Sequence, residues 1–367
     1  MNRRKILKTA ALASAVAGLS ACKKTSQSTS ACESGKTDAG VIEWKMVTTW
    51  PKNFPGLGTG AQFLADKITQ MSGGRLVVKV YGANELVPAF EVFDAVSSGT
   101  AQMGHGAAYY WKGKAPEAQF FGAVPFGMNA NEMNGWLYHG GGLELWEETY
   151  KPFGLKPLPA GQTGVQMGGW FNKEINGIED IKGLVMRIPG LAGDVLSRSG
   201  GTPQVLPGAE LFTALQTGTI DATEWVGPYN DLAFGLYQAA QFYYYPGWHE
   251  PTACLEAIIN QEAFDALPED LRTVVEMAAM AANQNMLSEY MANNQRALDT
   301  LQNEHQVKMK AFPEDVLATF KQHAQDVMLE LSQSSELAAR IHQSYFDFAA
   351  KTQAWLKVSE MAYLQAR

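Results

Sequence analysis

The order of the elements in residues 41–108 is the strongest constraint on how this chain can fold. Short runs with apolar side chains at alternate positions are separated by longer runs whose apolar side chains recur at helical spacing. Strands and helices that alternate over about seventy residues are typical of a largely parallel sheet with helices on its faces. We therefore expect an α/β fold, with strands at 41–49, 76–81 and 101–108 and helices at 56–71 and 89–97.

The remaining chain continues this pattern and then becomes almost entirely helical. The total length of 367 residues allows two domains of ordinary size. We expect strands within 155–171 and at 202–206, 220–226 and 253–260, and helices at 210–217, 261–304, 316–331 and 344–366. The last helix carries apolar side chains that need a partner, either in its own domain or on a second subunit.

The first 22 residues are typical of an export signal rather than of a folded domain. A basic start at Arg3, Arg4 and Lys5 precedes the small apolar run 9–19, which is too short to span a membrane as a stable helix. The arginine pair resembles a twin-arginine export signal. We therefore expect a protein exported to the periplasm.

A lipid anchor is indicated at Cys22. Residues 19–22 read Leu-Ser-Ala-Cys and resemble a bacterial lipobox, in which the cysteine is lipidated and becomes the mature N-terminus. An ordinary secretory signal with an incidental cysteine is the alternative. Residues 23–41 are rich in Ser, Thr, Lys and Gly and lack apolar periodicity, so they are interpreted as a flexible tether to the membrane.

Arg187 is the only cation in the apolar run 184–188, which is typical of a buried strand. Its guanidinium group cannot become neutral by losing a proton, so it must find an anion. One interpretation is an ion pair with an Asp or Glu of the fold, since buried charges are paired. The other is a fork that binds the carboxylate of a substrate.

Aromatic side chains gather where loops should leave the carboxyl ends of strands. Ligands of open α/β sheets bind at such ends, so the aromatic residues indicate a small apolar pocket, although each also fits an ordinary core position. The candidate wall residues are Tyr109, Tyr110, Trp111, Phe171, Trp225 and Trp248.

Composition and motifs exclude several classes of protein. A net charge of −8 disfavours nucleic-acid binding, which relies on a basic surface. There is no CxxC pair, no zinc-like Cys/His spacing, and no G-x-S-x-G, P-loop or HExxH motif. The best candidate for a catalytic base is His249, beside Glu250, but a histidine at such a position is more often packed or at the surface.

Several segments, in order between residues 42 and 331, carry a resemblance to a known family. The segments are D-x-K-G-L-x-x-R at 180–187, LFTALQTGTID at 211–221, and 84–103 with AVSSGT. On these segments the chain resembles the extracytoplasmic solute-binding proteins of tripartite ATP-independent periplasmic (TRAP) transporters, the DctP family. The segments 164–174, 223–228 and 245–251 are similar to a branch that binds small 2-oxo or 2-hydroxy monocarboxylates with a metal ion.

The resemblance implies a two-lobed, periplasmic-binding-protein-like fold with hinge strands, a long connecting helix and C-terminal helices. Domain I would comprise residues 42–160 plus about 253–300. Domain II would comprise residues 161–252 plus part of 301–343. Residues 344–367 would form a C-terminal helix that contacts a second copy in a homodimer. The partners would be a small carboxylate and the integral membrane subunits of a TRAP permease.

The resemblance also assigns roles to the site residues. Arg187 would form a bidentate clamp on the substrate carboxylate, with Tyr109, Tyr110 and Phe171 around the substrate. Gln166 would touch both substrate and metal. It stands where dicarboxylate and sialic-acid binders carry a second arginine, so a dianionic substrate is disfavoured.

Glu224, Trp225 and Glu250 would surround the metal ion, Trp225 through its backbone carbonyl. Two carboxylates and an anionic substrate against one arginine repel each other unless a cation lies between them. Oxygen ligands suit Ca²⁺, leave Na⁺ open and disfavour zinc. The alternative is that both glutamates lie on the solvated surface and bind no ion.

Two classes of function follow: a binding subunit without an organic cofactor, and a periplasmic metal-dependent enzyme acting on a 2-oxo acid. The absence of catalytic motifs favours the binding subunit.

Overall fold

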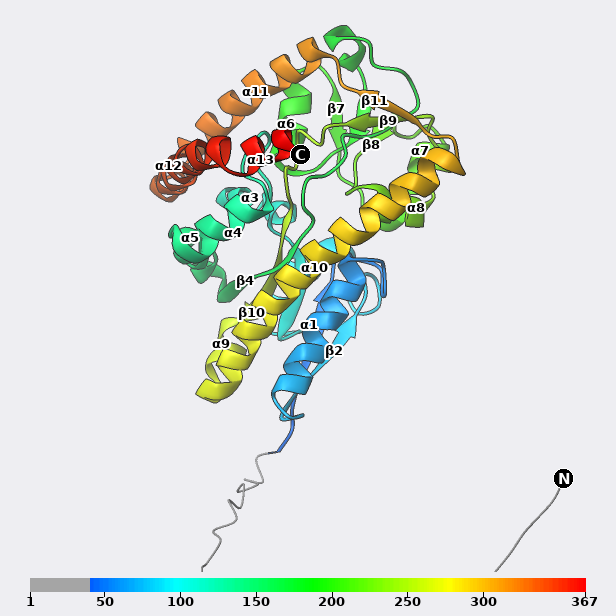
Figure 1. The fold of residues 1–367 in the computed structure, drawn as a ribbon. Coiled ribbons are helices and arrows are strands. Elements are labelled where there is room, and N and C mark those ends of the chain that lie inside the picture. Colours follow the sequence, from blue (N-terminus) through cyan, green and yellow to red (C-terminus); the bar gives the residue numbers. More distant parts are fainter. Residues whose placement is uncertain (1–39) are drawn as a thin grey trace, which may run out of the picture. The chain divides into compact units, whose positions relative to one another are not determined.

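The computed structural model describes residues 40–367. The predicted export signal, the lipobox with Cys22 and nearly all of the predicted tether lie outside the described residues. Within 40–367 the chain forms two mixed α/β lobes, each built around one sheet (Figure 1). The predicted α/β, two-lobed architecture with C-terminal helices is confirmed.

The first sheet has the strand order β2-β1-β3-β10-β4. Its strands are β1 (Ile42–Thr48), β2 (Leu76–Tyr81), β3 (Met103–Ala107), β4 (Leu155–Gln162) and β10 (Cys254–Asn260). β1 pairs in parallel with β2 and β3, whereas β10 pairs antiparallel with β3 and β4. The sheet is therefore parallel only over its first three strands, because the chain leaves this lobe after β4 and returns to it along β10.

The second sheet has the strand order β11-β9-β5-β8-β6-β7. Its strands are β5 (Gly169–Phe171), β6 (Val185–Arg187), β7 (Thr202–Gln204), β8 (Ala222–Thr223), β9 (Phe242–Tyr245) and β11 (Lys308–Ala311). β6 runs parallel to β8 in a register that places Arg187 opposite Thr223. The strand expected over 220–226 is thus only two residues long, and Glu224 and Trp225 follow it as it leaves the sheet.

One long helix connects the two lobes. α10 (Glu269–Asn303) packs against α1 (Leu57–Met71) and β4 in the first lobe and against α8 (Pro228–Phe234) in the second (Figure 1). Pro268 precedes its first turn, and Glu269 and Asp270 place acidic side chains at the positive end of the helix dipole. The predicted long connecting helix is confirmed. The predicted domain boundaries near residues 160 and 252 stay predictions.

The other helices cover the sheets and form the C-terminal end of the chain. They are α2 (Val92–Ser97), α3 (Gln119–Gly122), α4 (Ala130–His139), α5 (Gly142–Tyr150), α6 (Gly190–Arg198), α7 (Leu211–Gln216), α9 (Gln261–Asp265), α11 (Glu314–Ser332), α12 (Glu336–Val358) and α13 (Glu360–Ala366). The helix expected over 344–366 is two helices, because the backbone leaves the helical region at Ser359. Among residues 40–367, none of the helices combines the length and apolar character that a membrane span requires.

Candidate functional site

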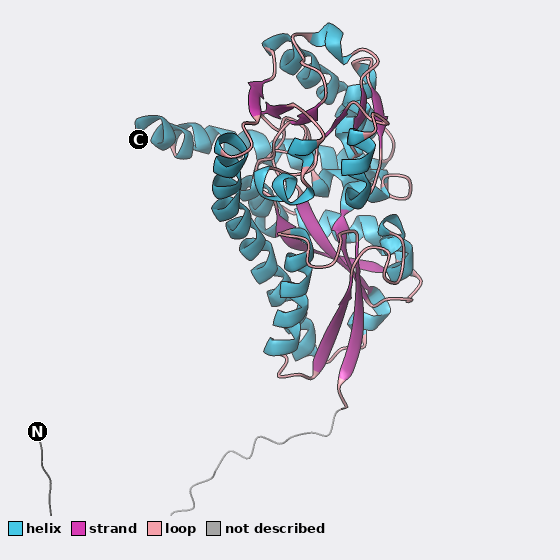
Figure 2. Ribbon diagram, turned by 90° about the vertical axis from the view of Figure 1, so that its right-hand side faces the viewer, coloured by secondary structure: helices cyan, strands magenta, loops and turns pink. Residues whose placement is uncertain are grey.

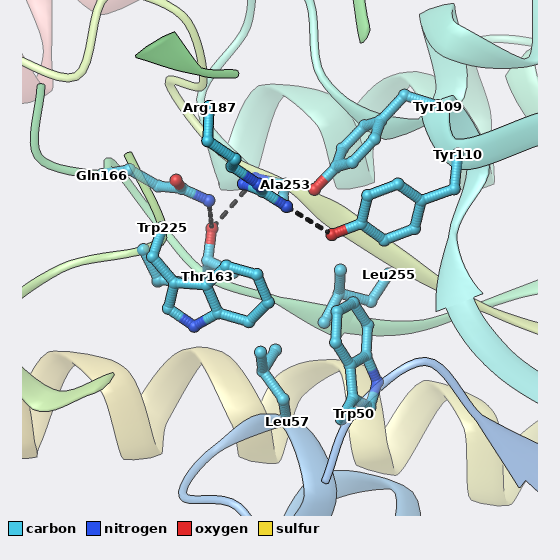
Figure 3. A pocket seen from close by; sticks show the side chains of 11 residues that line it. Trp50, Leu57, Tyr109, Tyr110, Thr163, Gln166, Arg187, Trp225, Ala253 and Leu255 are labelled. Atoms are coloured by element: carbon cyan, nitrogen blue, oxygen red, sulfur yellow. Dashed lines mark hydrogen bonds between the residues drawn. The ribbon is translucent and has the colours of Figure 1, made fainter. Parts of the chain in front are cut away.

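A small cavity lies between the two lobes and is lined by residues from both (Figure 3). Arg187, Gln166 and the two tyrosines Tyr109 and Tyr110 lie toward one end of it, and Leu57 and Trp50 lie toward the other. The lining residues are Trp50, Leu57, Tyr109, Tyr110, Thr163, Gln166, Arg187, Trp225, Val226, Ala253 and Leu255. The cavity therefore has a polar end that contains one cation and an apolar end.

Arg187, the last residue of β6, is 1 % exposed. Its guanidinium donates to the Glu224 carboxylate, to the Leu206 carbonyl through Nε (3.1 Å) and to the Tyr110 hydroxyl through NH2 (3.2 Å). Its guanidinium carbon lies 5.0 Å from the centre of the Trp225 ring. The arginine thus forms the structural ion pair that was one of the two interpretations, and it also lines the cavity.

The β6–β8 register explains the contact between Arg187 and Glu224. Arg187 lies opposite Thr223, and the next residue, Glu224, donates its backbone N–H to the Arg187 carbonyl at 3.3 Å. The second carboxylate oxygen of Glu224 lies 3.3 Å from Nε2 of His249. Glu224 is 1 % exposed, so it is not part of a solvated face.

Glu250 is the second buried carboxylate and is 4 % exposed. It accepts a 2.7 Å hydrogen bond from Nε2 of Gln166. Burial raises the pKa of Glu250 well above its usual range, and the nearby Glu224 raises it further, whereas Arg187 lowers it. A cation beside these carboxylates would relieve this repulsion.

The amide of Gln166 leaves one polar atom without a partner. Its Nε2 donates to Glu250 and to the Thr163 hydroxyl (3.2 Å), whereas its Oε1 is buried and accepts no hydrogen bond from the described residues. The Pro246-Gly247-Trp248 turn supports the Gln166 backbone, since Gly247 N–H donates to its carbonyl at 3.0 Å and a β-carbon at Gly247 would collide with that carbonyl.

The donor set fits a hard cation. The unpartnered amide oxygen of Gln166 and the carboxylates of Glu224 and Glu250 are all oxygen donors, as Ca²⁺ and Na⁺ prefer. Within residues 40–367, no three side chains of His, Cys, Asp or Glu gather in a metal-binding cluster. A cation here would therefore need the amide and a backbone carbonyl in addition to the two carboxylates.

Burial raises the pKa of Tyr110 to about 12, although the positive charge of Arg187 lowers it. The hydroxyl therefore keeps its proton at neutral pH. Because it accepts a hydrogen bond from Arg187, its own proton is available to an acceptor in the cavity.

Three predicted wall residues do not line the cavity. The ring of Phe171 packs on Tyr244, with ring centres 4.9 Å apart, and on Phe312. Trp248 packs on Phe320 at 4.4 Å, and Trp111 donates its indole N–H to Glu256. These rings fill the apolar core instead, so the predicted role of Phe171 in substrate binding is not supported by its position.

The cavity also contains residues that the sequence did not single out. Trp50 follows β1 at its carboxyl end, so the rule that indicated Tyr109 and Tyr110 could have found it. Its indole N–H donates to Nδ1 of the buried His105 at 2.8 Å. Leu57, Thr163, Ala253 and Leu255 carry no local signal of a binding role.

Comparisons with known proteins identify the family of the chain. The sequence profile of the bacterial extracellular solute-binding proteins, family 7 (DctP), matches residues 46–334. The chain is 41 % identical over 363 residues to the monocarboxylate 2-oxoacid-binding periplasmic protein of Nostoc sp., covering 99 % of this chain and 98 % of that protein.

Solved structures of TRAP periplasmic solute-binding proteins agree with this result. One from Pseudoalteromonas atlantica, with bound sodium and pyruvate, is 43 % identical with a TM-score of 0.87, covering 89 % of this chain and 100 % of that chain. One from Colwellia psychrerythraea, with bound calcium and pyruvate, is 42 % identical with the same TM-score and the same coverage.

The two lobes and the cavity between them define the architecture of a solute-binding protein. The chain belongs to the DctP family of bacterial extracellular solute-binding proteins, whose members are receptors for solutes and not enzymes. The predicted family is therefore confirmed, and the alternative of a metal-dependent enzyme has no support.

Proposed function

We propose that this protein captures a small 2-oxo or 2-hydroxy monocarboxylate of the pyruvate type together with Ca²⁺ or Na⁺. It then delivers the carboxylate to the membrane subunits of a TRAP transporter. The observation that carries the proposal is the buried Arg187 in a cavity that also holds an unpartnered amide oxygen and two buried carboxylates. The names of the similar proteins, which mention 2-oxoacids, pyruvate, sodium and calcium, support it.

The charges of the site favour a monocarboxylate. Arg187 neutralises one of the two buried glutamates, so a divalent cation leaves a net positive charge of one for the ligand. A monoanion cancels that charge, whereas a dianion would leave a buried charge unpaired, which is costly.

Each end of the cavity suits a different part of such a ligand. The Arg187 guanidinium would bind the carboxylate, and the Tyr110 hydroxyl would donate to it or to the 2-oxygen. Gln166, Glu224, Glu250 and the backbone carbonyl of Trp225 would hold the cation, which supplies positive charge to the ligand oxygens. The apolar end, at Leu57, Trp50 and Leu255, would accept the rest of the molecule.

Calorimetry with pyruvate tests the proposal. We expect binding in the presence of CaCl₂ or NaCl and a loss of affinity of at least about tenfold after removal of the cations, since Arg187 alone cannot balance the two glutamates and the anionic ligand. A parallel thermal-shift series should show that pyruvate raises the melting temperature, because a ligand that binds only the folded state stabilises it. Unchanged affinity without Ca²⁺ and Na⁺ would exclude the cation, and absence of binding would exclude the ligand class.

We also propose a homodimer formed through the C-terminal helices. α13 extends away from the body of the molecule (Figure 2). Trp355 of α12 is 65 % exposed, and Tyr363 and Leu364 of α13 are 65 % and 56 % exposed. A groove of about 620 Å³ runs beside these helices, lined by Phe126, Met128, Phe346, Leu356, Met361 and Leu364 together with polar residues. A second copy can offer an equivalent apolar helix to this groove, as a two-fold interface requires.

We propose in addition that the protein is exported by the twin-arginine route and anchored by a lipid on Cys22. The support is the sequence of residues 1–22, together with membership of an extracellular family. Mass spectrometry of the membrane fraction should find an acylated N-terminal Cys22, and a Cys22→Ala variant should be released in soluble form.

A further inference from the structure

We propose that Thr163 is a positioning residue that directs the amide oxygen of Gln166 toward the cation. The inference rests on the proposed function and deepens it. Thr163 directly follows β4, is 2 % exposed and lines the cavity. It lies beside Gln166, and its hydroxyl faces the Gln166 amide (Figure 3).

The hydroxyl of Thr163 uses all of its hydrogen-bonding capacity. It donates to the Gly164 carbonyl at 2.9 Å and accepts from Ala253 N–H at 2.9 Å and from Nε2 of Gln166 at 3.2 Å. A hydroxyl has one proton and two acceptor positions, so no further bond is available.

This arrangement determines which way the Gln166 amide faces. Because the single proton of Thr163 is directed to Gly164, its oxygen can only accept from the amide. Thr163 therefore selects the NH₂ side of Gln166, the same side that donates to the Glu250 carboxylate at 2.7 Å. The amide oxygen must point the other way, where it is buried without a partner and can bind a cation.

Thr163 also joins the two segments that cross between the lobes. Its backbone N–H donates to the Ala253 carbonyl at 3.2 Å, and its hydroxyl accepts from the Ala253 N–H. Thr163 lies on the segment that leads from β4 to β5, and Ala253 lies on the segment that leads from β9 to β10. The orientation of the Gln166 amide thus depends on the contact between these two segments.

The test compares Thr163→Val with Thr163→Ser. Valine keeps the shape but removes the hydroxyl, so the Gln166 amide loses one of its two acceptors and can rotate. We expect calorimetry to show a 10–100-fold weaker Ca²⁺ affinity at saturating pyruvate, on the order found when a group that orients a metal ligand is removed. Serine keeps the hydroxyl, so the Ca²⁺ affinity of Thr163→Ser should stay within about threefold of the wild-type affinity, well short of the loss expected for Thr163→Val.

A matched control separates positioning from stability. Thr149 is also buried, and its hydroxyl bonds only to the Leu145 carbonyl in α5, away from the cavity. Thr149→Val should lower the melting temperature of the cation-free protein but leave the Ca²⁺ affinity unchanged. If Thr163→Val does not fold, Thr163→Ala takes its place in the comparison.

The outcomes distinguish the two proposals. Wild-type Ca²⁺ affinity in Thr163→Val would overturn the role of Thr163 alone, and so would a loss in Thr163→Ser equal to that in Thr163→Val. Failure of the wild-type protein to bind pyruvate with Ca²⁺ would overturn the proposed function and this inference with it.

Discussion

Arg187 carries two kinds of contact that a sequence cannot separate. Its planar guanidinium has five N–H donors, and Glu224, Leu206 and Tyr110 occupy donors on all three of its nitrogens. The ion pair with Glu224 holds the side chain in a fixed position before any ligand arrives. This preorganisation is useful to a receptor, because less side-chain entropy is lost on binding.

At this scale we predict that Arg187→Ala folds but does not bind pyruvate in calorimetry. Loss of the arginine leaves Glu224 buried without its partner, which should lower the free energy of unfolding by ~3–5 kcal/mol. The control is Arg198→Ala, which breaks the exposed pair with Glu330 and should cost only about 0–1 kcal/mol while affinity is kept. Near-normal affinity in Arg187→Ala would contradict the carboxylate clamp.

At the scale of elements, β10 combines two tasks. Ala253 directly before it and Leu255 within it line the cavity, whereas Glu256 points to the other face and accepts hydrogen bonds from the Trp111 indole and the Tyr150 hydroxyl. The alternation of side chains along a strand separates these two surfaces. One strand thereby serves the binding site and the aromatic core at once.

The pH dependence of stability should reveal the buried Glu256. Burial raises its pKa from 4.5 to about 7, although its hydrogen bonds lower it. An acid with a raised folded-state pKa contributes stability that is fully present below its unfolded pKa, and this stability is lost as the pH rises through the folded pKa. The contribution, ~3 kcal/mol, should therefore disappear between about pH 4.5 and pH 7.

Chemical denaturation at several pH values measures this effect. In Glu256→Gln the free energy of unfolding should lose this part of its pH dependence. This holds even if the variant differs from the wild type in stability at any one pH. The exposed Glu43→Gln on β1 should keep the wild-type profile. Parallel profiles for wild type and Glu256→Gln would show that Glu256 does not titrate in this range.

At the scale of the whole molecule, α12 and α13 carry a group of exposed apolar side chains near the C-terminus. We expect light scattering to give twice the mass of one chain. A Trp355→Glu, Leu364→Glu variant should be monomeric, because burying the new charges in the interface is costly. Met291→Glu is the control, since Met291 is more exposed (75 %) than Trp355 and Leu364 but lies on α10, so the variant should leave the dimer intact. A monomeric wild type would contradict the proposal.

Much of this architecture was accessible from the sequence. The order of strands and helices, the long helix near 269–303 and the family could be predicted because each depends on patterns among residues that are neighbours in the chain. Arg187 stood out as a cation in an apolar run, whereas the roles of Gln166, Glu224 and Glu250 came from the resemblance of their segments to the family. The structure brings these four residues together through the β6–β8 register and the turn at 246–248.

Which aromatic and small residues line the cavity was decided only by the tertiary structure. Phe171 and Trp248 look like pocket walls in sequence but pack into the core, whereas Trp50, Thr163 and Leu255 line the cavity. The physical reason is that local spacing indicates when a side chain is buried, not what it is buried against. That depends on segments more than fifty residues apart, such as those of Trp50 and His105 or of Thr163 and Ala253, which meet only when the chain folds.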